Sequence, residues 1–582
     1  MGLDAQSTFY AFFSTKRHGA IGDNPWCTKL CFMHNSSFMH SKDTMLQHDL
    51  EPVDVAVIGF GPVGATLAAL LGRRGLRVAV FDKSQQIYPL PRAFALDHEA
   101  LRVFQEIGIA GTLAPHMTPY RPTIYQGSDG EPIQHFDMGP SPYPLAWAPS
   151  YTFNQPALEA SLREAVGQMP GVSIHLGHEV LQLSQSPDHA LLGVRRPDGT
   201  EAQLRARYVV GCDGGTSPTR KQMGLKLKSL DFDEPWIVVD MHVDEDKLDR
   251  LPATNVQYCH PSRPCTYVVG PGTHRRWEFL LLPDEAEQRE MPHESIWKLL
   301  APWLTPEDAR IWRAATYRFH AVVLTQWRNG RVLLAGDSAH QMPPFLAQGM
   351  CQGLRDAVNL AWKLQWVLEE RAPESLLDSY GEERGPQVEE VTATVKRLGQ
   401  IICERDPVRA AERDRLLREQ QGGQVRMQLR QSLLPGVHHG LIDRDELPAG
   451  TPFPQAIGSI EAGVAPQMMD DLLSHGFLLV LRHAPDAAAL RALREPAAAL
   501  GAQLLCIDAA AAASGIATLA EADGILAAWF ERHQCEAALV RPDHLVYGVA
   551  RGAGEVEALM QRACSTLGAT LNRPATVLQE PT

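Results

Sequence analysis

The hydrophobic and polar positions of the chain are most regular between Val53 and Asp82. A short apolar run, Val53–Ile58, is followed by the glycine-rich segment 59–64, by a longer apolar run to Gly75, and by a third short run that ends at Asp82. Short apolar runs bounded by glycine are typical of buried strands, whereas the longer run has the length of a helix. The pattern predicts strand, turn, helix and strand, followed by an acidic residue.

The glycines of this segment have the spacing of a dinucleotide-binding turn. Gly59 allows a tight turn, Gly61 lets the backbone approach a pyrophosphate, and Gly64 lets the helix pack closely on the strand. The helix N-terminus then offers free N–H groups to phosphates, and Asp82 can accept hydrogen bonds from a ribose diol. A glycine-rich turn in another α/β fold is the alternative, and the flanking strand, helix and acid argue against it.

Further elements are predicted along the first 400 residues. Helices are expected at about 97–107, from Gln155 onward, and after Asp337, where Leu354, Val358 and Ala361 have helical spacing. Strand-like alternation and turn residues mark the segments 172–183, 191–195, 204–210 and 332–335. Between residues 225 and 318 the pattern changes to short strands, which predicts an inserted antiparallel sheet. Its strands are expected at 236–243, 255–259, 266–269 and 277–282.

The end of the chain predicts a separate small α/β unit. Its strands are expected at 477–481, 503–507, 537–541 and 545–549, with a closing helix at 555–567. This order resembles the thioredoxin fold, but no Cys-x-x-Cys is present. We therefore expect Cys506, Cys535 and Cys564 to be core residues without redox chemistry.

These patterns divide the chain into five parts. Residues 1–50 show no clear period and are expected to be a disordered extension, with Met45 as a natural start. Cys27, Cys31, His34 and His40 fit no common zinc-finger spacing, and no metal is predicted. The other parts are a nucleotide-binding domain (51–224 and 319–400), a substrate-binding sheet (225–318), a linker or helical region (401–450) and the small C-terminal unit (451–582).

Composition narrows the range of partners. The net charge of −14 disfavours binding to nucleic acid or to an anionic membrane surface, and no apolar run approaches the roughly 18 residues needed to span a bilayer. The 10 cysteines lack paired spacing, which suits reduced thiols and a cytoplasmic protein. A homodimer is a further expectation, with the C-terminal unit as a dimer contact or as the support of a lid.

Two more motifs follow the glycine-rich turn, each after a predicted strand. One is Cys212-Asp213-Gly214-Gly215, continuing to Arg220, and the other begins Gly336-Asp337-Ser338-Ala339-His340 and continues through Gln348-Gly349-Met350. Together the three motifs resemble the fingerprints of the single-component FAD-dependent aromatic hydroxylases, the p-hydroxybenzoate hydroxylase class, over about residues 52–400. Segments such as 91–108 and 540–543 most resemble the 3-(3-hydroxyphenyl)propionate hydroxylases. Asp82, Ala347 and Cys351 replace the commoner Glu, Gly and Asn.

This resemblance implies a fold and a set of cofactor contacts. The expected fold is α/β, with a Rossmann-like FAD-binding domain, an inserted antiparallel-sheet substrate domain and a C-terminal thioredoxin-like domain. The resemblance assigns FAD contacts to the following residues: Gly59, Gly61, Gly64, Asp82, Arg92, Gln155, Asp213, Gly336, Asp337, Gly349 and Met350. Asp213 would lie near the FAD pyrophosphate and influence NAD(P)H binding. The helix from Gly349 would direct its N-terminal dipole at the flavin pyrimidine edge.

The implied reaction is hydroxylation of a phenolic acid ortho to its hydroxyl, with NAD(P)H and O2. The expected substrates are 3-(3-hydroxyphenyl)propionate and 3-hydroxycinnamate, and NADH is the expected donor, with NADPH as the alternative. A base that deprotonates the phenol would activate the ring. The proposed catalytic residues are His340, Tyr258 and Pro344, with His260 and His320 as further bases. The cations considered for a substrate carboxylate are Arg263, Arg275, Arg276 and Arg318.

Other functions are compatible with the same motifs. The chain could hydroxylate another phenol or a polyketide quinone, or it could bind flavin without catalysis. A flavin halogenase is disfavoured because its Trp-x-Trp-x-Ile-Pro signature is absent.

Overall fold

The computed structural model describes residues 50–286, 290–444, 446–461, 463–508 and 516–568. Of the predicted extension at 1–50, only residue 50 is described. The Cys and His residues at 27–40 lie outside the described residues. The described segments belong to one compact unit. Within them, no helix combines the length and the apolar character needed to cross a bilayer.

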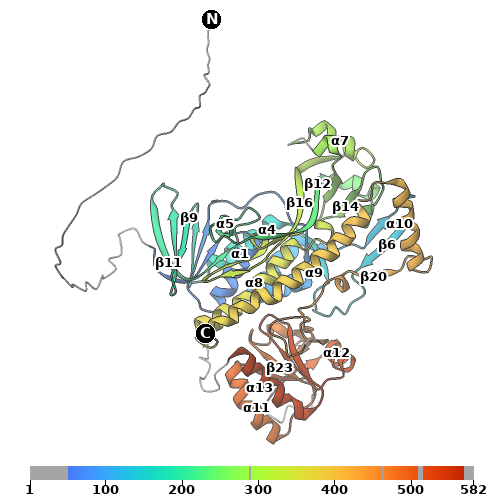
Figure 1. Ribbon diagram of the computed structural model, residues 1–582. Helices are drawn as coiled ribbons and strands as arrows, with labels where there is room; N and C mark the ends of the chain where they lie inside the picture. Colours follow the sequence, from blue (N-terminus) through green and yellow to red (C-terminus); the bar gives the residue numbers. More distant parts are fainter. Residues whose placement is uncertain (1–49, 287–289, 445, 462, 509–515, 569–582) are drawn as a thin grey trace, which may run out of the picture. The chain divides into compact units, whose positions relative to one another are not determined.

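The predicted nucleotide-binding half is built on an eight-stranded sheet (Figure 1). Its central strands run parallel in the order β18-β11-β1-β2-β8. The side chains of Val55 and Val57 are fully buried, as expected for a parallel strand covered on both faces. The strands are β1 (Val53–Ile58), β2 (Val78–Asp82), β8 (Val172–Leu176), β9 (Glu179–Gln185), β10 (Ala190–Arg195), β11 (Glu201–Gly211), β17 (Arg328–Asn329) and β18 (Val332–Leu334).

One predicted strand is two strands in the structure. The alternation at 172–183 divides at Gly177, whose φ of +70° lies in the left-handed region that glycine tolerates. β8 before this glycine pairs parallel with β2, whereas β9 after it pairs antiparallel with β10. A period of two continues across such a turn, so the alternation alone could not show the break.

Helices cover this sheet, and the first begins at the glycine-rich turn. α1 (Pro62–Arg73) has Gly61 at its N-cap and proline at its first position, where no N–H is required. It packs against α8 (Gly349–Leu368), and a Cβ on Gly353 would lie 2.5 Å from a methyl carbon of Val63. The other helices of this half are α2 (His98–Ile107), α3 (Ala110–Leu113), α4 (Gln155–Gly167), α5 (Pro218–Gln222) and α9 (Asp378–Ile402). A small sheet joins β3 (Ala95–Asp97), β4 (Met117–Pro119) and β7 (Ser150–Phe153).

The predicted inserted sheet has nine strands in the order β19-β16-β12-β15-β14-β13-β5-β6-β20. It takes in strands from outside residues 225–318, because β5, β6 and β20 extend one edge and β19 the other. The strands are β5 (Thr123–Gln126), β6 (Pro132–Asp137), β12 (Leu227–Val243), β13 (Asn255–Tyr258), β14 (Cys265–Val269), β15 (His274–Leu280), β16 (Ala309–Leu324), β19 (His340–Gln341) and β20 (Met427–Leu429). α6 (Pro283–Ala286), α7 (His293–Leu300) and α10 (Pro407–Gln420) accompany it.

The C-terminal part holds a five-stranded sheet in the order β25-β24-β23-β27-β28. β23 pairs parallel with β24 and antiparallel with β27. Its elements are β23 (Leu478–Leu481), α11 (Ala487–Leu500), β24 (Gln503–Cys506), β25 (Ala517–Thr518), α12 (Ile525–His533), β27 (Ala537–Val540), β28 (Val546–Ala550) and α13 (Val556–Leu567). A three-stranded sheet lies beside them: β21 (Ile457–Ser459), β22 (Gln467–Met468) and β26 (Ala520–Glu521).

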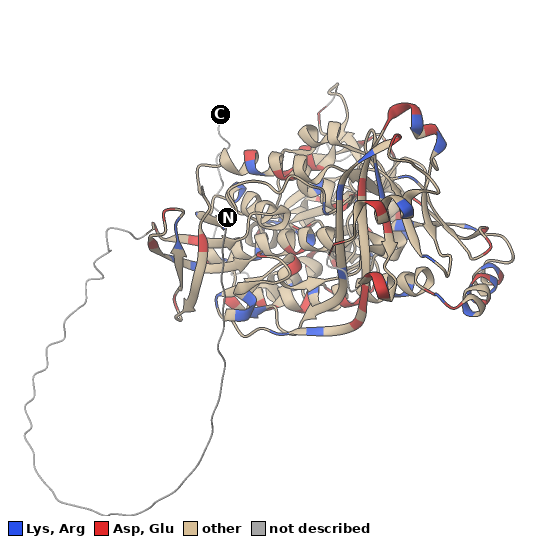
Figure 2. Ribbon diagram, turned by 90° about the horizontal axis from the view of Figure 1, so that it is seen from above, with Lys and Arg blue, Asp and Glu red and all other residues tan. Residues whose placement is uncertain are grey.

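A buried ion network joins this C-terminal part to α8 and α9. Glu383 on α9 accepts hydrogen bonds from Arg541 at 3.0 and 2.8 Å and from Lys363 on α8 at 2.8 Å. All three side chains are completely buried. Elsewhere Lys and Arg are interspersed with Asp and Glu along the ribbon rather than separated by sign (Figure 2).

Candidate functional site

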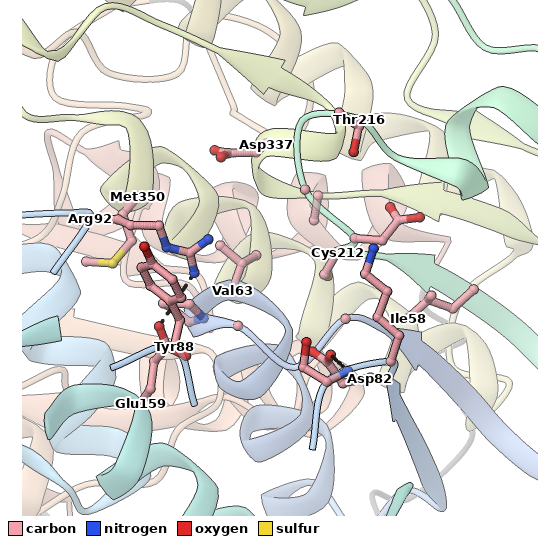
Figure 3. A pocket seen from close by; sticks show the side chains of 18 of the residues that line it. Ile58, Val63, Asp82, Tyr88, Arg92, Glu159, Cys212, Thr216, Asp337 and Met350 are labelled. Carbon is pink, nitrogen blue, oxygen red and sulfur yellow. Dashed lines mark hydrogen bonds and ion pairs between the residues drawn. The ribbon is translucent and has the colours of Figure 1, made fainter. Parts of the chain in front are cut away.

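A cavity of about 1220 Å³ opens at the carboxyl ends of β1 and β2. This is the edge of an open α/β sheet at which ligands bind. Residues from all three sequence motifs line it, and Figure 3 shows Asp82 at one side of the view and Arg92 with Met350 at the other. The predicted residues that it brings together are Gly59, Gly61, Asp82, Arg92, Gln155, Asp213, Asp337, Gly349 and Met350.

The glycine-rich turn forms one wall of this cavity. Gly59 has φ +102°, and a Cβ there would lie 2.4 Å from the carbonyl oxygen of Cys212. A Cβ on Gly64 would lie 2.0 Å from the carbonyl oxygen of Gly59, whereas a Cβ on Gly61 would meet no atom within 4 Å. Gly59 and Gly64 therefore permit the fold, and Gly61 leaves open space at the N-terminus of α1, where backbone N–H groups are free for an anion.

Asp82 is held in place at the end of β2. Its Oδ2 accepts a hydrogen bond from the N–H of Phe60 at 2.8 Å, and its Oδ1 accepts one from the N–H of Ser84 at 2.7 Å. These contacts tie the carboxylate to the glycine-rich turn. Each carboxylate oxygen can accept a further hydrogen bond, so the group can still bind a diol.

Arg92 lies on a loop whose backbone is held by the side chain of Gln155. The side-chain oxygen of Gln155 accepts hydrogen bonds from the backbone N–H groups of Arg92 and Ala93, at 3.1 and 2.6 Å. Its amide nitrogen donates to Glu159 at 2.7 Å, and burial raises the pKa of that carboxyl. Gln155 thus lines the cavity as a support of the Arg92 loop. The guanidinium of Arg92 is half exposed and lies over the Tyr88 ring (Figure 3).

Asp213 holds the start of the short helix α5, whose N-cap is Ser217. One carboxylate oxygen accepts a hydrogen bond from the Ser217 hydroxyl, and the other accepts one from the N–H of Thr219 at 2.9 Å. The backbone that follows Asp213 turns at Gly214, with φ +80°, along the cavity wall. The carboxylate therefore shapes the wall as well as lining it.

Asp337 projects into the cavity and accepts no hydrogen bond from any residue that the structure describes. Enclosure by protein raises the pKa of its carboxyl. The preceding residue, Gly336, has φ +64° and donates its N–H to Asp356 of α8 at 2.9 Å. The carboxylate is exposed to the cavity and can accept further hydrogen bonds, so this position suits a ligand that carries hydroxyl groups.

The predicted catalytic residues lie outside the cavity lining. His340 is buried, and its Nε2 contacts Asp356 at 2.7 Å, so it supports the turn at Gly336. Tyr258 lies on the far side of the nine-stranded sheet, where its hydroxyl accepts a hydrogen bond from the Trp303 indole at 3.2 Å. Pro344 begins a short turn over residues 344–346 that leads toward α8. Of the other bases considered, His320 lines the cavity, and His260 contacts Ser262 on an exposed loop.

Sequence reasoning missed the residue that joins the third motif together. Asp356 is fully buried on α8 and accepts hydrogen bonds from Gly336, from His340 and from Arg384 at 2.8 Å. The charges of His340 and Arg384 outweigh the effect of burial and lower the pKa of this carboxyl. The available signal was the pair Arg355-Asp356 within a mostly apolar helix, where a charge needs a buried partner.

Comparisons with known proteins agree with this geometry. Residues 52–395 match the family described as FAD binding domain, and residues 450–565 match the HcaD C-terminal domain. A probable NADH-specific resorcinol 4-hydroxylase of Rhodococcus jostii (strain RHA1) is 38% identical over 530 residues, covering 90% of this chain and 96% of that one. A 3-(3-hydroxy-phenyl)propionate/3-hydroxycinnamic acid hydroxylase of Burkholderia cenocepacia (strain HI2424) is 34% identical over 528 residues, covering 86% and 94%.

Solved structures share the fold at lower identity. The crystal structure of the flavin-dependent monooxygenase PieE in complex with FAD and substrate has a TM-score of 0.74 at 22% identity, covering 90% of this chain and 100% of that one. Aklavinone-11 hydroxylase with FAD and aklavinone has a TM-score of 0.71 at 23% identity, with the same coverage. With a family match over more than half of its length and a cavity lined by the motifs that predicted it, the chain belongs to the FAD-binding-domain family.

Proposed function

We propose that this protein is an NADH- and O2-dependent FAD monooxygenase that hydroxylates a meta-substituted phenol at the carbon next to its hydroxyl. The observation that carries the proposal is the meeting of all three motifs around one cavity in a chain of this family. The names of its relatives support the reaction class, since both describe hydroxylation of a phenolic ring.

The residues present fit FAD. The open space at Gly61 would admit the pyrophosphate at the N-terminus of α1, Asp82 would bind the ribose, and Asp337 would gain the donors that it lacks from the ribityl hydroxyls. Gly349 and Met350 begin α8, whose cap residue Gln348 makes no side-chain bond to the helix N–H groups. These groups would face the flavin ring and stabilise negative charge on it. When bound, FAD supplies the electron transfer and oxygen chemistry.

The protein's own part is to position and enclose the reactants. Asp213 and Asp356 fix the two turns that border the cofactor cavity, and Gln155 fixes the loop that carries Arg92. We propose His340 as a positioning residue that acts through Asp356, and Pro344 as part of the wall beside the ring. Tyr258 faces away from this region. It could act as the phenol base only if the substrate ring were bound on the far side of the sheet, away from the cavity.

Two phenols are the leading substrates. 3-(3-Hydroxyphenyl)propionate follows from the sequence resemblance and from the Burkholderia relative at 34% identity. Resorcinol is favoured by the Rhodococcus relative at 38% identity. In both, the attacked carbon adjoins a phenolic hydroxyl. A larger phenol or polyketide quinone and a non-catalytic flavin-binding role are the alternatives that the first experiment addresses.

The experiment is NADH oxidation by the purified, FAD-loaded protein, with O2 consumption and product measured together. 3-(3-Hydroxyphenyl)propionate, resorcinol, phenol and 3-hydroxybenzoate would be compared, each with NADH and with NADPH. One dihydroxylated or trihydroxylated product per NADH, with one substrate far ahead of the others, supports the proposal. Bound flavin without substrate-stimulated oxidation would refute catalysis on these phenols.

We propose a thioredoxin-like fold for the C-terminal unit. Support comes from the parallel pair β23–β24, the antiparallel pairs β23–β27 and β27–β28, and the helices α11 and α13. Cys506, Cys535 and Cys564 are apart in the sequence, and burial raises the pKa of each thiol, which disfavours redox chemistry. A cytoplasmic location and a homodimer stay predictions.

A further inference from the structure

The nine-stranded sheet turns one face toward the cofactor-binding half. Along β15 the side chains of Trp277 and Phe279 belong to the apolar cluster that includes Ile296 of α7. Because side chains alternate along a strand, Arg276 and Glu278 point to the opposite face. Arg276 donates a hydrogen bond to the carbonyl oxygen of Arg92 at 3.0 Å, so that opposite face is the one directed at the cofactor cavity.

Glu278 lies opposite the turn of the third motif. On one side of it, Val268, the cross-strand partner of Arg276, shares an apolar cluster with Ala347. On the other side, Leu280 shares a cluster with Phe345. Ala347 and Phe345 belong to the turn that immediately precedes Gly349 and α8. Glu278 is thus flanked on the strand by two apolar clusters that include the segment bordering the proposed flavin ring, and it lies beside the cavity rather than in its lining.

The carboxylate of Glu278 lacks a partner there. Its side chain is only 10% exposed, yet within the described part of the chain no group donates a hydrogen bond to it. The nearest cation, Arg276, has a nitrogen 3.8 Å away, but its guanidinium already makes two bonds to Asp240, at 2.7 and 3.0 Å. The carboxylate oxygens are not among the fully enclosed atoms without a partner, so a ligand can reach them and supply the missing donor.

We propose that Glu278 accepts the hydrogen bond, and then the proton, of the substrate's phenolic hydroxyl. This inference rests on the proposed function. In the step, the O–H bond of the phenol breaks, its electron pair stays on the oxygen, and the proton joins a carboxylate oxygen of Glu278; no atom is oxidised or reduced. The resulting phenolate activates the ring carbon beside it. An anionic substituent would be repelled here, so the propionate of a phenylpropionate substrate must point away from Glu278.

The titratable groups around Glu278 differ in their pKa shifts. Burial raises the pKa of Glu278 to about 7 against the opposing charge of Arg276. The charges of Arg276 and His274 lower the pKa of Asp240 despite its burial, burial lowers that of His274, and burial raises that of the Cys265 thiol. A base with a pKa near the working pH suits proton transfer from a phenol.

The test compares binding of resorcinol and of its monomethyl ether, 3-methoxyphenol, to the FAD-loaded protein by calorimetry. Methylation removes one hydroxyl donor. We expect wild type to prefer resorcinol by about tenfold or more, and Glu278→Gln, which keeps the side-chain size, to lose most of that preference. Glu294→Gln on α7 makes the same chemical change at an exposed site and should behave as wild type. Flavin absorbance reports that each variant is loaded.

The pH dependence of wild type gives a second measurement that needs no variant. Above about pH 7 the carboxylate is ionised and accepts the hydroxyl, so the preference for resorcinol should rise between pH 5.5 and 8.5. A flat preference over this range, or an unchanged preference in FAD-loaded Glu278→Gln, would overturn the inference. Phenol-stimulated NADH oxidation by wild type would still uphold the proposed function in that case. Absence of both binding and turnover with all phenols would overturn the proposed function itself.

Discussion

Removing the charge of Glu383 should greatly destabilise the protein. Glu383 is completely buried and accepts two hydrogen bonds from Arg541, one from Lys363 and one from the Asn359 amide at 2.6 Å. In Glu383→Gln the amide oxygen can still accept, but the charge that balances both cations is lost. Arg541 keeps Asp543, whereas Lys363 has no other carboxylate within ion-pair distance among the described residues.

The expected cost is about 3–5 kcal/mol, the range for breaking a buried ion pair by removing one partner. Lys363 limits the upper end, because burial already lowers its pKa to about 8 despite the charge of Glu383, so it can shed its proton when the carboxylate is gone. Urea unfolding followed by tryptophan fluorescence is a suitable assay. The indole of Trp362, one of 11 tryptophans in the chain, donates to Asp543 at 3.2 Å, so the signal includes a contribution from the network.

The control is Glu382→Gln, the same change on the adjacent, exposed residue of α9. It should alter the free energy of unfolding by no more than about 0.5 kcal/mol. If Glu383→Gln unfolds at the same urea concentration as Glu382→Gln, the network contributes no stability and the reasoning is wrong.

Three further outcomes are expected. Gly61→Ala should fold normally but bind FAD at least about tenfold more weakly, measured by flavin fluorescence. Gly64→Ala should unfold at a lower temperature than wild type, because its Cβ would clash with a carbonyl oxygen. Equal melting temperatures of the two variants would contradict this. Ala347→Gly should raise the free energy of unfolding by about 1 kcal/mol, since Ala347 has φ +53°, and an unchanged melting temperature would count against strain. The pKa of Asp470 is lowered to about 2, because the charges of Arg102 and His544 outweigh burial. Its stabilising contribution of about 2–3 kcal/mol should therefore be present above about pH 4 and be lost as the pH falls toward 2. The urea midpoints of wild type and Asp470→Asn should converge at that low pH.

The cofactor half was predictable because its signals are local. The glycine-rich turn, the helix at about 97–107 and the apolar face of α8 each lie within one element, and the structure confirms all three. The edges of the large sheet were not predictable in this way. β5 and β20 lie far from residues 225–318 in the chain, and their pairing depends on tertiary contacts that no local period records.

The substrate side shows a different limit. Alternation locates a strand, but it does not say which face meets the cofactor. Tyr258 was therefore proposed as a base and Glu278 was not considered, although the two point to opposite sides. Glu383 was overlooked for a related reason. The run Glu382-Glu383-Arg384 reads as a solvated helix face, whereas only Glu382 is exposed.

The order of strands in the cofactor sheet has a consequence for synthesis of the protein. β18 begins at Val332 and α8 at Gly349, yet both complete a layer whose first strand begins at Val53. A nascent chain must therefore emerge from the ribosome through about residue 368 before β11 gains its neighbour β18 and α1 gains its cover. Until then part of the apolar surface of β11 and α1 stays uncovered, which favours chaperone binding to the growing chain and cofactor capture late in translation.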